Sequence, residues 1–250
     1  MSKLSQIFQQ TKPFIGYLTA GDGGIDHTLD CAQALIQGGV HILEIGFPFS
    51  DPVADNPEVQ LSHDRALAQN LTSTTLLKII EGIRDFNREI PLLLYSYYNP
   101  LLQRGLDYLY KLKDAGIDGV CIIDLPVPQT LSEKDPFFEN LLDVGVDPIL
   151  LITAKTSQER CLLTQRYARG FLYYSPHEAS KEDFVEQFKK VREHFNIPVV
   201  VRKDIFDREE AWRVLDYSDG FIVKTAFVRQ ITNDSSMEGL VSLARSIDPS

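Results

Sequence analysis

Short apolar segments that favour β-strands alternate along this chain with stretches of helical periodicity. Eight such segments are predicted strands: Pro13–Thr19, His41–Ile45, Pro91–Tyr98, Gly119–Leu125, Pro148–Thr153, Gly170–Tyr174, Pro198–Arg202 and Gly220–Lys224. They are apolar throughout, which is typical of parallel strands that helices cover on both faces. Eight strand–helix units in 250 residues, about 31 residues each, predict an α/β fold, the (β/α)8 TIM barrel.

The prediction is a single domain over residues 1–250. No linker, low-complexity stretch or shift in composition divides the chain. An open, doubly wound sheet is the alternative arrangement of parallel strands, but the Gly-x-Gly-x-x-Gly fingerprint of its dinucleotide-binding members is absent. Eight units close a barrel more naturally than they build such a sheet.

Composition narrows the class of protein. The 35 acidic and 25 basic residues give a formal charge of −10, without the electrostatic footprint of a nucleic-acid binder. No apolar run approaches the roughly 20 residues of a membrane span, and residues 1–12 do not form a signal peptide. The three cysteines and five histidines lack metal-binding spacings. We expect a cytoplasmic protein with reduced thiols that binds no metal, nucleic acid or membrane.

Polar residues at the carboxyl ends of the predicted strands are the candidate site, because that end of a barrel carries the active site. Glu44 lies in the second segment between two apolar neighbours. It is either a buried acid paired with a Lys or Arg, or a general acid–base group whose pKa burial raises. Residues 47–57 follow with three prolines and two aspartates, which makes a stiff loop. Asp51 and Asp55 are either turn formers or functional carboxylates.

A long motif in this loop identifies a family. Residues 43–55 read Leu-Glu-Ile-Gly-Phe-Pro-Phe-Ser-Asp-Pro-Val-Ala-Asp, which closely resembles the signature of tryptophan synthase alpha subunits. Further matches in register are residues 18–22 (Leu-Thr-Ala-Gly-Asp), Gln60, residues 97–100 (Tyr-Tyr-Asn-Pro) and residues 124–126 (Asp-Leu-Pro). The chain is identified as a member of that family.

The resemblance implies a reaction and roles for the site residues. Members of the family are (β/α)8 barrels that cleave indole-3-glycerol phosphate to indole and glyceraldehyde 3-phosphate. Glu44 would be the catalytic acid–base that protonates the indole ring, and Asp55 would hold the indole N–H and stabilise the positive charge that develops there. Tyr97 and Asp124 would line the indole pocket. Tyr173, one of two tyrosines that end the sixth segment, is expected to be a further pocket residue.

The resemblance also implies a partner. In this family the indole passes through a tunnel to a beta subunit, which uses pyridoxal phosphate to join it to serine. This chain would need no cofactor of its own and would form an alpha2beta2 complex. The expected partner interface is the loop that holds Asp55, with Pro52, Asn56 and Pro57.

Three segments depart from the family pattern at the turns that hold substrate phosphate. Where the family has glycine-containing turns, this chain has Ser-Pro-His-Glu-Ala-Ser at 175–180, Arg-Lys-Asp-Ile-Phe at 202–206 and Lys-Thr-Ala at 224–226. Backbone N–H groups of glycine approach phosphate oxygens without a Cβ in the way. Charge-assisted hydrogen bonds contribute roughly 1.5–3 kcal/mol each, and about 1.4 kcal/mol is a factor of ten in rate. We therefore expect the lyase reaction to be impaired and the main role to be activation of the beta subunit.

Three alternatives remain open for the altered turns. In one, cationic side chains rebuild the phosphate site and the lyase is fully active. The residues of this altered phosphate site are Arg202, Lys203, Lys224 and Thr225. In another, the charges are paired with nearby acidic side chains, namely Glu178, Asp204 or Asp207. In the third, the barrel has been repurposed for a different phosphorylated or acidic ligand.

Overall fold

The computed structural model describes residues 2–127, 134–175, 181–234 and 236–249. Within these ranges, eight parallel strands close into one barrel in the order of the sequence. The strands are β1 (Phe14–Thr19), β2 (Ile42–Gly46), β3 (Leu92–Ser96), β4 (Gly119–Ile122), β5 (Asp147–Ile152), β6 (Leu172–Tyr174), β7 (Val199–Val201) and β8 (Phe221–Val223). Each predicted segment overlaps one of them, and the predicted (β/α)8 barrel is confirmed.

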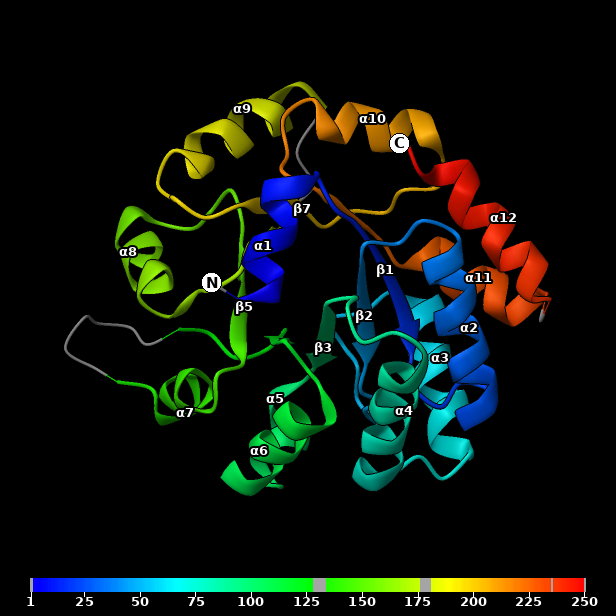
Figure 1. Ribbon diagram of the computed structural model, residues 1–250. Helices are drawn as coiled ribbons and strands as arrows, with labels where there is room; N and C mark the ends of the chain where they lie inside the picture. The colour runs from blue at the N-terminus through cyan, green and yellow to red at the C-terminus, as the bar shows by residue number, and fades with distance from the viewer. Residues whose placement is uncertain (1, 128–133, 176–180, 235, 250) are drawn as a thin grey trace.

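Most of the helices form a ring around the strands, and the first helix lies inside that ring (Figure 1). They are α1 (Lys3–Gln10), α2 (Ile25–Gln37), α3 (Pro57–Ala68), α4 (Ser73–Phe86), α5 (Tyr98–Leu102), α6 (Leu106–Ala115), α7 (Pro136–Val144), α8 (Gln158–Tyr167), α9 (Lys181–Arg192), α10 (Arg208–Leu215), α11 (Thr225–Asn233) and α12 (Met237–Ile247). Helix α1 precedes the first strand and was not expected from the sequence. It is a short amphipathic helix, whose packing rather than its own propensity stabilises it.

Two predicted strands end two or three residues earlier in the structure, whereas the others end within one residue of the prediction. Strand β3 stops at Ser96 instead of Tyr98, and β4 stops at Ile122 instead of Leu125. The cause is one contact between the two ends, in which the Oδ1 of Asp124 accepts a hydrogen bond of 2.7 Å from the backbone N–H of Tyr98. The carboxylate satisfies an amide at the start of α5, and the chain therefore turns into a helix there.

Helix α1 closes the amino-terminal end of the barrel. Leu4 is fully buried among the inward-facing residues of the strands, and the Phe8 and Phe171 rings lie 5.3 Å apart. A Cβ on Gly119 would lie only 2.5 Å from the Leu4 side chain. The absence of a side chain at the start of β4 thus makes room for the helix, and this end of the barrel is filled with apolar groups.

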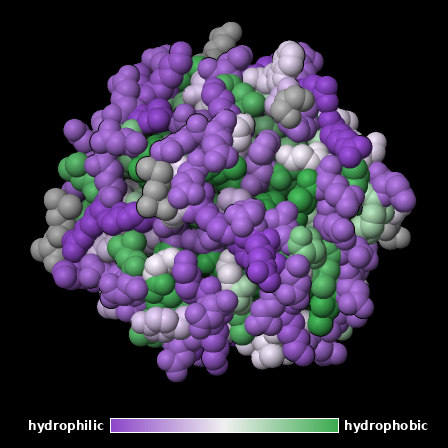
Figure 2. Space-filling view, in the orientation of Figure 1, coloured by the Kyte–Doolittle hydropathy of each residue, from purple (hydrophilic) through white to green (hydrophobic). Residues whose placement is uncertain are grey.

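The surface and the cysteines add two observations. The face shown in Figure 2 is mostly hydrophilic, with apolar side chains in small, separated groups. No helix within the described ranges is both long and apolar enough to cross a membrane. Cys31, Cys121 and Cys161 are buried and form no disulfide.

Candidate active site

Glu44 projects from β2 into the barrel, where it is fully buried. Its Oε1 accepts a hydrogen bond of 3.0 Å from the hydroxyl of Tyr173 on β6. Among the described residues, no cation lies within ion-pair distance of Glu44, and its Oε2 has no hydrogen-bond partner. Burial raises the pKa of Glu44, while Lys224 and Arg202 oppose the rise only in part. A carboxyl group with a raised pKa and a free oxygen suits proton donation.

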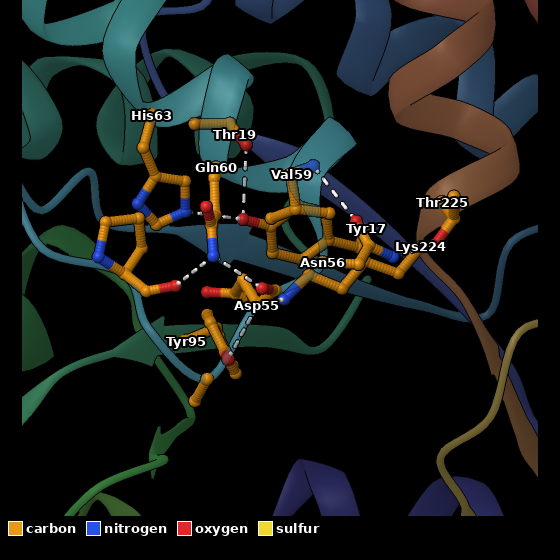
Figure 3. Close-up of polar contacts among 12 residues, drawn as sticks. Tyr17, Thr19, Asp55, Asn56, Val59, Gln60, His63, Tyr95, Lys224 and Thr225 are labelled. Carbon is orange, nitrogen blue, oxygen red and sulfur yellow. Dashed lines mark hydrogen bonds and ion pairs between the residues drawn. The ribbon is translucent and has the colours of Figure 1, made fainter.

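Asp55 lies at the centre of a polar network (Figure 3). Its Oδ1 accepts hydrogen bonds from the hydroxyl of Tyr95 at 2.9 Å and from the Nζ of Lys224 at 2.5 Å. Its Oδ2 accepts a hydrogen bond of 2.9 Å from the hydroxyl of Tyr97. Burial alone would raise the pKa of Asp55, but Lys224 and Arg202 outweigh it and lower the pKa. Asp55 is therefore a buried carboxylate that already has three donors.

Two of the three cations in the altered turns, Arg202 and Lys224, face inward. Lys224 follows β8, and its Nζ lies 3.7 Å from the centre of the Tyr95 ring. Arg202 follows β7, donates to the Tyr95 hydroxyl at 3.0 Å and lies 3.8 Å from Oδ1 of Asp55. Burial lowers the pKa of Lys224 to about 8, although Asp55 opposes the shift. These side chains thus neutralise Asp55 from inside the barrel.

The expected acidic partners of these cations need correction. Asp204 accepts a hydrogen bond from the hydroxyl of Thr225, and Asp207 caps α10 through the backbone N–H of Glu210. Glu178 lies outside the described residues. Lys224 and Arg202 are indeed paired with an acidic side chain, but that side chain is Asp55. The reason is that both cations directly follow their strands at positions that face into the barrel. For Lys203, which is half-buried, the described part of the chain shows no ion pair.

The loop that carries Asp55 is fastened to its surroundings. The side-chain amide of Asn56 donates to the hydroxyl of Thr225 at 2.6 Å and accepts from the backbone N–H of Val59, which makes Asn56 the N-cap of α3 ahead of Pro57. The side-chain amide of Gln60 donates to the backbone carbonyls of Asp55 at 2.8 Å and Pro52 at 3.3 Å. The expected interface loop is therefore ordered by contacts within this chain.

Two cavities open near the carboxyl ends of the strands. One of about 180 Å³ is lined by Asp55, Arg202, Lys203, Lys224 and Thr225, among others. The other, of about 380 Å³, is lined by residues 122–127 with the end of β5 and the start of α8. The exposed Asp124 lines this second cavity, while Asp55 lines the first. The assignment of Asp124 to an indole pocket stays a prediction.

Sequence reasoning missed three residues of the network, namely Tyr17, His63 and Tyr95. The hydroxyl of Tyr17 lies 3.1 Å from that of Thr19 and 3.3 Å from Nε2 of His63. Tyr95 joins Asp55 to Arg202. Side chains along a strand alternate between its two faces, and this alternation turns Glu44 inward. The same rule could have identified Tyr17 and Tyr95, since each lies at an inward-facing position of its strand. His63 comes from α3, and no sequence pattern marks it.

His63 is a neutral member of the network. Its Nδ1 accepts a hydrogen bond of 3.1 Å from the backbone N–H of Phe49. Burial lowers the pKa of His63 to about 4, against the opposing effect of Asp55. The residues that the structure describes contain no group of three or more His, Cys, Asp or Glu side chains able to hold a metal ion. His63 thus joins the network through its contacts with the backbone of Phe49 and the hydroxyl of Tyr17.

The fold and the site together define a class. A carboxyl group with a raised pKa and a second, ionised carboxylate at the carboxyl end of the strands are typical of a (β/α)8-barrel enzyme. A family model described as "Tryptophan synthase alpha chain" matches residues 4–246. The chain belongs to the tryptophan synthase alpha chain family, and is therefore a lyase subunit of tryptophan biosynthesis.

Relatives and solved structures agree with this membership. The tryptophan synthase alpha chain of Chlamydia trachomatis serovar D is 68% identical, over 100% of both chains. That of Coxiella burnetii (strain CbuK_Q154) is 37% identical, over 100% of this chain and 98% of the relative. Tryptophan synthase subunit alpha from Legionella pneumophila has a TM-score of 0.91 at 28% identity, covering 99% of this chain and 97% of that one. A chain of the tryptophan synthase complex from Pyrococcus furiosus has a TM-score of 0.85 at 28% identity, covering 94% and 97%.

Proposed function

We propose that this lyase subunit has a weak or absent alpha reaction of its own, and that its main role is to bind and activate a tryptophan synthase beta subunit. The observation that carries the proposal is the ion pair of 2.5 Å between Lys224 and Asp55. In the reaction that the family performs, Asp55 would hold the indole N–H. That oxygen already accepts from an ammonium group, which binds a carboxylate more strongly than a neutral N–H does.

The cavity supports the same proposal. Its volume of about 180 Å³ is smaller than the roughly 300–1,000 Å³ that is usual for small-molecule sites. Charged side chains line it where bare backbone amides would be needed to cradle a phosphate group. Indole-3-glycerol phosphate would have to displace a buried cation before it could reach Asp55.

The groups for proton transfer are nevertheless in place. Glu44 would deliver a proton to the indole ring, and the Tyr173 hydroxyl would orient its carboxyl group. A residual lyase reaction would depend on these two residues. The residual rate would be limited by substrate positioning, because binding energy at a remote phosphate is what places the reacting atoms.

The partner in this proposal is a beta subunit in an alpha2beta2 complex in the cytoplasm, with pyridoxal phosphate in the beta subunit and none in this chain. The loop from Pro52 to Pro57 is the proposed interface. Its tip, Val53, is 74% exposed, while Asp55 and Asn56 are held by interior contacts. Solved structures of tryptophan synthase from Mycobacterium tuberculosis and of the tryptophan synthase complex from Pyrococcus furiosus contain chains of this fold.

The test measures steady-state cleavage of indole-3-glycerol phosphate with and without the cognate beta subunit, alongside beta turnover from indole and serine. We expect negligible cleavage and a beta subunit that turns over several-fold faster with this chain present. Cleavage at ordinary enzymatic rates, lost on Lys224→Ala or Arg202→Ala, would instead establish a rebuilt cationic phosphate site. A thermal-shift screen in which another phosphorylated metabolite stabilises the chain, and indole-3-glycerol phosphate does not, would indicate a repurposed barrel.

A further inference from the structure

Lys224 is a buried charge for which the family reaction gives no use. Its side chain is 11% exposed and lies between the rings of Tyr17 and Tyr95, with Nζ 4.2 Å and 3.7 Å from their centres. Figure 3 shows it pointing from the end of β8 toward Asp55. A buried ammonium group is costly unless it is paired. Since Asp55 is its only ion-pair partner among the described residues, these two side chains depend on each other.

Asp55 in turn belongs to a loop that is anchored at several points. Its neighbour Ala54 donates its backbone N–H to the hydroxyl of Tyr97 at 3.0 Å, and the same hydroxyl donates to Oδ2 of Asp55. Asn56 is bonded to Thr225, the residue that follows Lys224. Two consecutive residues of the loop are therefore tied to two consecutive residues at the start of α11. The ties are made by side chains of this chain alone.

The ion pair is the strongest of these ties. It is shorter than the tyrosine hydrogen bonds, joins two charges and is shielded from water, with the Asp55 side chain only 1% exposed. Screening by solvent, which weakens exposed ion pairs, is therefore small here. Arg202, 3.8 Å away from the same oxygen, adds a second positive charge on the same side.

We infer that Lys224 is a positioning residue, a built-in counterion that holds Asp55 and the loop from Pro52 to Pro57 in one conformation without any ligand. The loop then presents its exposed tip to the partner as a preformed surface. This last step rests on the proposed function, while the ordering of the loop does not. A preformed loop binds more tightly, because no ordering cost is subtracted from the binding free energy.

The first experiment measures hydrogen exchange of the backbone amides of Ala54 and Asp55 in the full chain. Lys224→Met keeps the length of the side chain and removes its charge, and Lys203→Met is the matched control on the same cavity. We expect exchange at the two amides to rise about tenfold or more in Lys224→Met and to stay unchanged in the control. Amides within β1 to β3 should keep their protection in both variants. Unchanged exchange in a folded Lys224→Met would overturn the inference.

Two further variants test the same inference in case Lys224→Met does not fold. Asp55→Asn combined with Lys224→Met removes both charges and keeps one acceptor oxygen, while the amide NH2 can donate to the second tyrosine hydroxyl. Lys224→Arg keeps the charge. Arginine should retain most of the loop protection and the double variant should fold with an exposed, exchanging loop. A double variant with wild-type protection would show that the ion pair does not order the loop.

The second experiment measures the affinity of the cognate beta subunit for the same variants. We expect the dissociation constant of Lys224→Met to rise by the same factor as its loop exchange, with beta turnover at saturation close to wild type. Faster exchange in the loop together with an unchanged affinity for the beta subunit would overturn the inference that the preformed loop strengthens binding of the partner. If the wild-type chain neither binds nor activates the beta subunit, the proposed function fails, and the exchange result still decides the role of Lys224.

Discussion

The two ends of the barrel interior are filled by opposite kinds of side chain. At the amino-terminal end, Leu4, Ile15, Leu93 and Phe171 are fully buried and apolar. Toward the carboxyl end, the same strands enclose two carboxyl groups, two cations and four tyrosines; these are Glu44, Asp55, Arg202, Lys224, Tyr17, Tyr95, Tyr97 and Tyr173.

The two ends of the barrel interior therefore serve different purposes: the apolar end stabilises the fold, and the polar end holds the groups for chemistry. Dispersion and burial stabilise the amino-terminal end, and each group there is replaceable by another apolar group of similar size. At the carboxyl end, every polar group depends on a particular partner, since an unpaired buried charge costs several kcal/mol. Two atoms there, Oε2 of Glu44 and Nε of Arg202, lack hydrogen-bond partners among the described residues. A third such atom, the hydroxyl oxygen of Tyr174, lies outside this network, beside the rings of Phe184 and Phe188.

The largest effect is expected when Asp55 is removed. Asp55→Ala leaves Lys224 and Arg202 buried without their carboxylate, and we expect a loss of about 3–5 kcal/mol in the free energy of unfolding. Urea denaturation measures it. Adding Lys224→Met should recover part of the loss, because the two side chains share one interaction. A loss of no more than about 1 kcal/mol in the single variant, the range typical of exposed ion pairs, would contradict the account of the carboxyl end.

Truncating a side chain at the amino-terminal end of the barrel should lower the free energy of unfolding without affecting the candidate active site. Leu4→Ala removes a fully buried side chain that packs against Gly119, and we expect a loss of about 2–5 kcal/mol in the free energy of unfolding. Exchange of the Ala54 amide and the effect on the beta subunit should stay at wild-type values at temperatures where the variant is folded. A change in either would show that the two ends are coupled.

Acid should weaken the carboxyl end through His63. The pKa of His63 is about 4 in the folded chain and about 6.5 when unfolded. The unfolded state thus takes up the proton first as pH falls, so the stabilising contribution is complete above pH 6.5 and declines toward pH 4. We expect a slope of up to about 1.4 kcal/mol per pH unit from this residue. Asp55, Lys224 and Asp64 are the charged groups that act on it.

The measurement is urea denaturation at several pH values for wild type and His63→Asn. Asparagine can still accept from the Phe49 N–H but does not titrate in this range. The variant should be less stable at pH 7 and show a shallower fall in stability between pH 6.5 and 4. Parallel curves for the two proteins would assign the acid sensitivity to the carboxylates instead.

The smallest effect is expected for Tyr173→Phe. The substitution removes the hydroxyl that donates to Oε1 of Glu44 and costs about 0.5–1.5 kcal/mol, a typical hydrogen bond. The pKa of Glu44, followed by carbon-13 NMR of the labelled carboxyl, should rise further because the hydrogen bond now lowers it. An unchanged or lowered pKa would show that Tyr173 does not orient the acid.

The sequence predicted the barrel because eight apolar segments recur at the spacing of strand–helix units, and parallel strands impose that pattern locally. It also singled out Glu44 and Asp55 as candidate site residues, through a motif whose residues are close along the chain. The early ends of β3 and β4 were not predictable, because Asp124 and Tyr98 meet only after folding. Helix α1 depends in the same way on the end of the barrel that it covers.

What the sequence by itself determined is the architecture, the family and the set of altered turns, since these follow from local order and spacing. Only the tertiary structure decided that Lys224 and Arg202 turn inward to Asp55, some 170 and 150 residues away along the chain. Local pattern places a lysine at a strand end without telling which charge it meets. The reason is physical: a buried ion pair is set by the distance between two atoms, and that distance exists only once the barrel has closed.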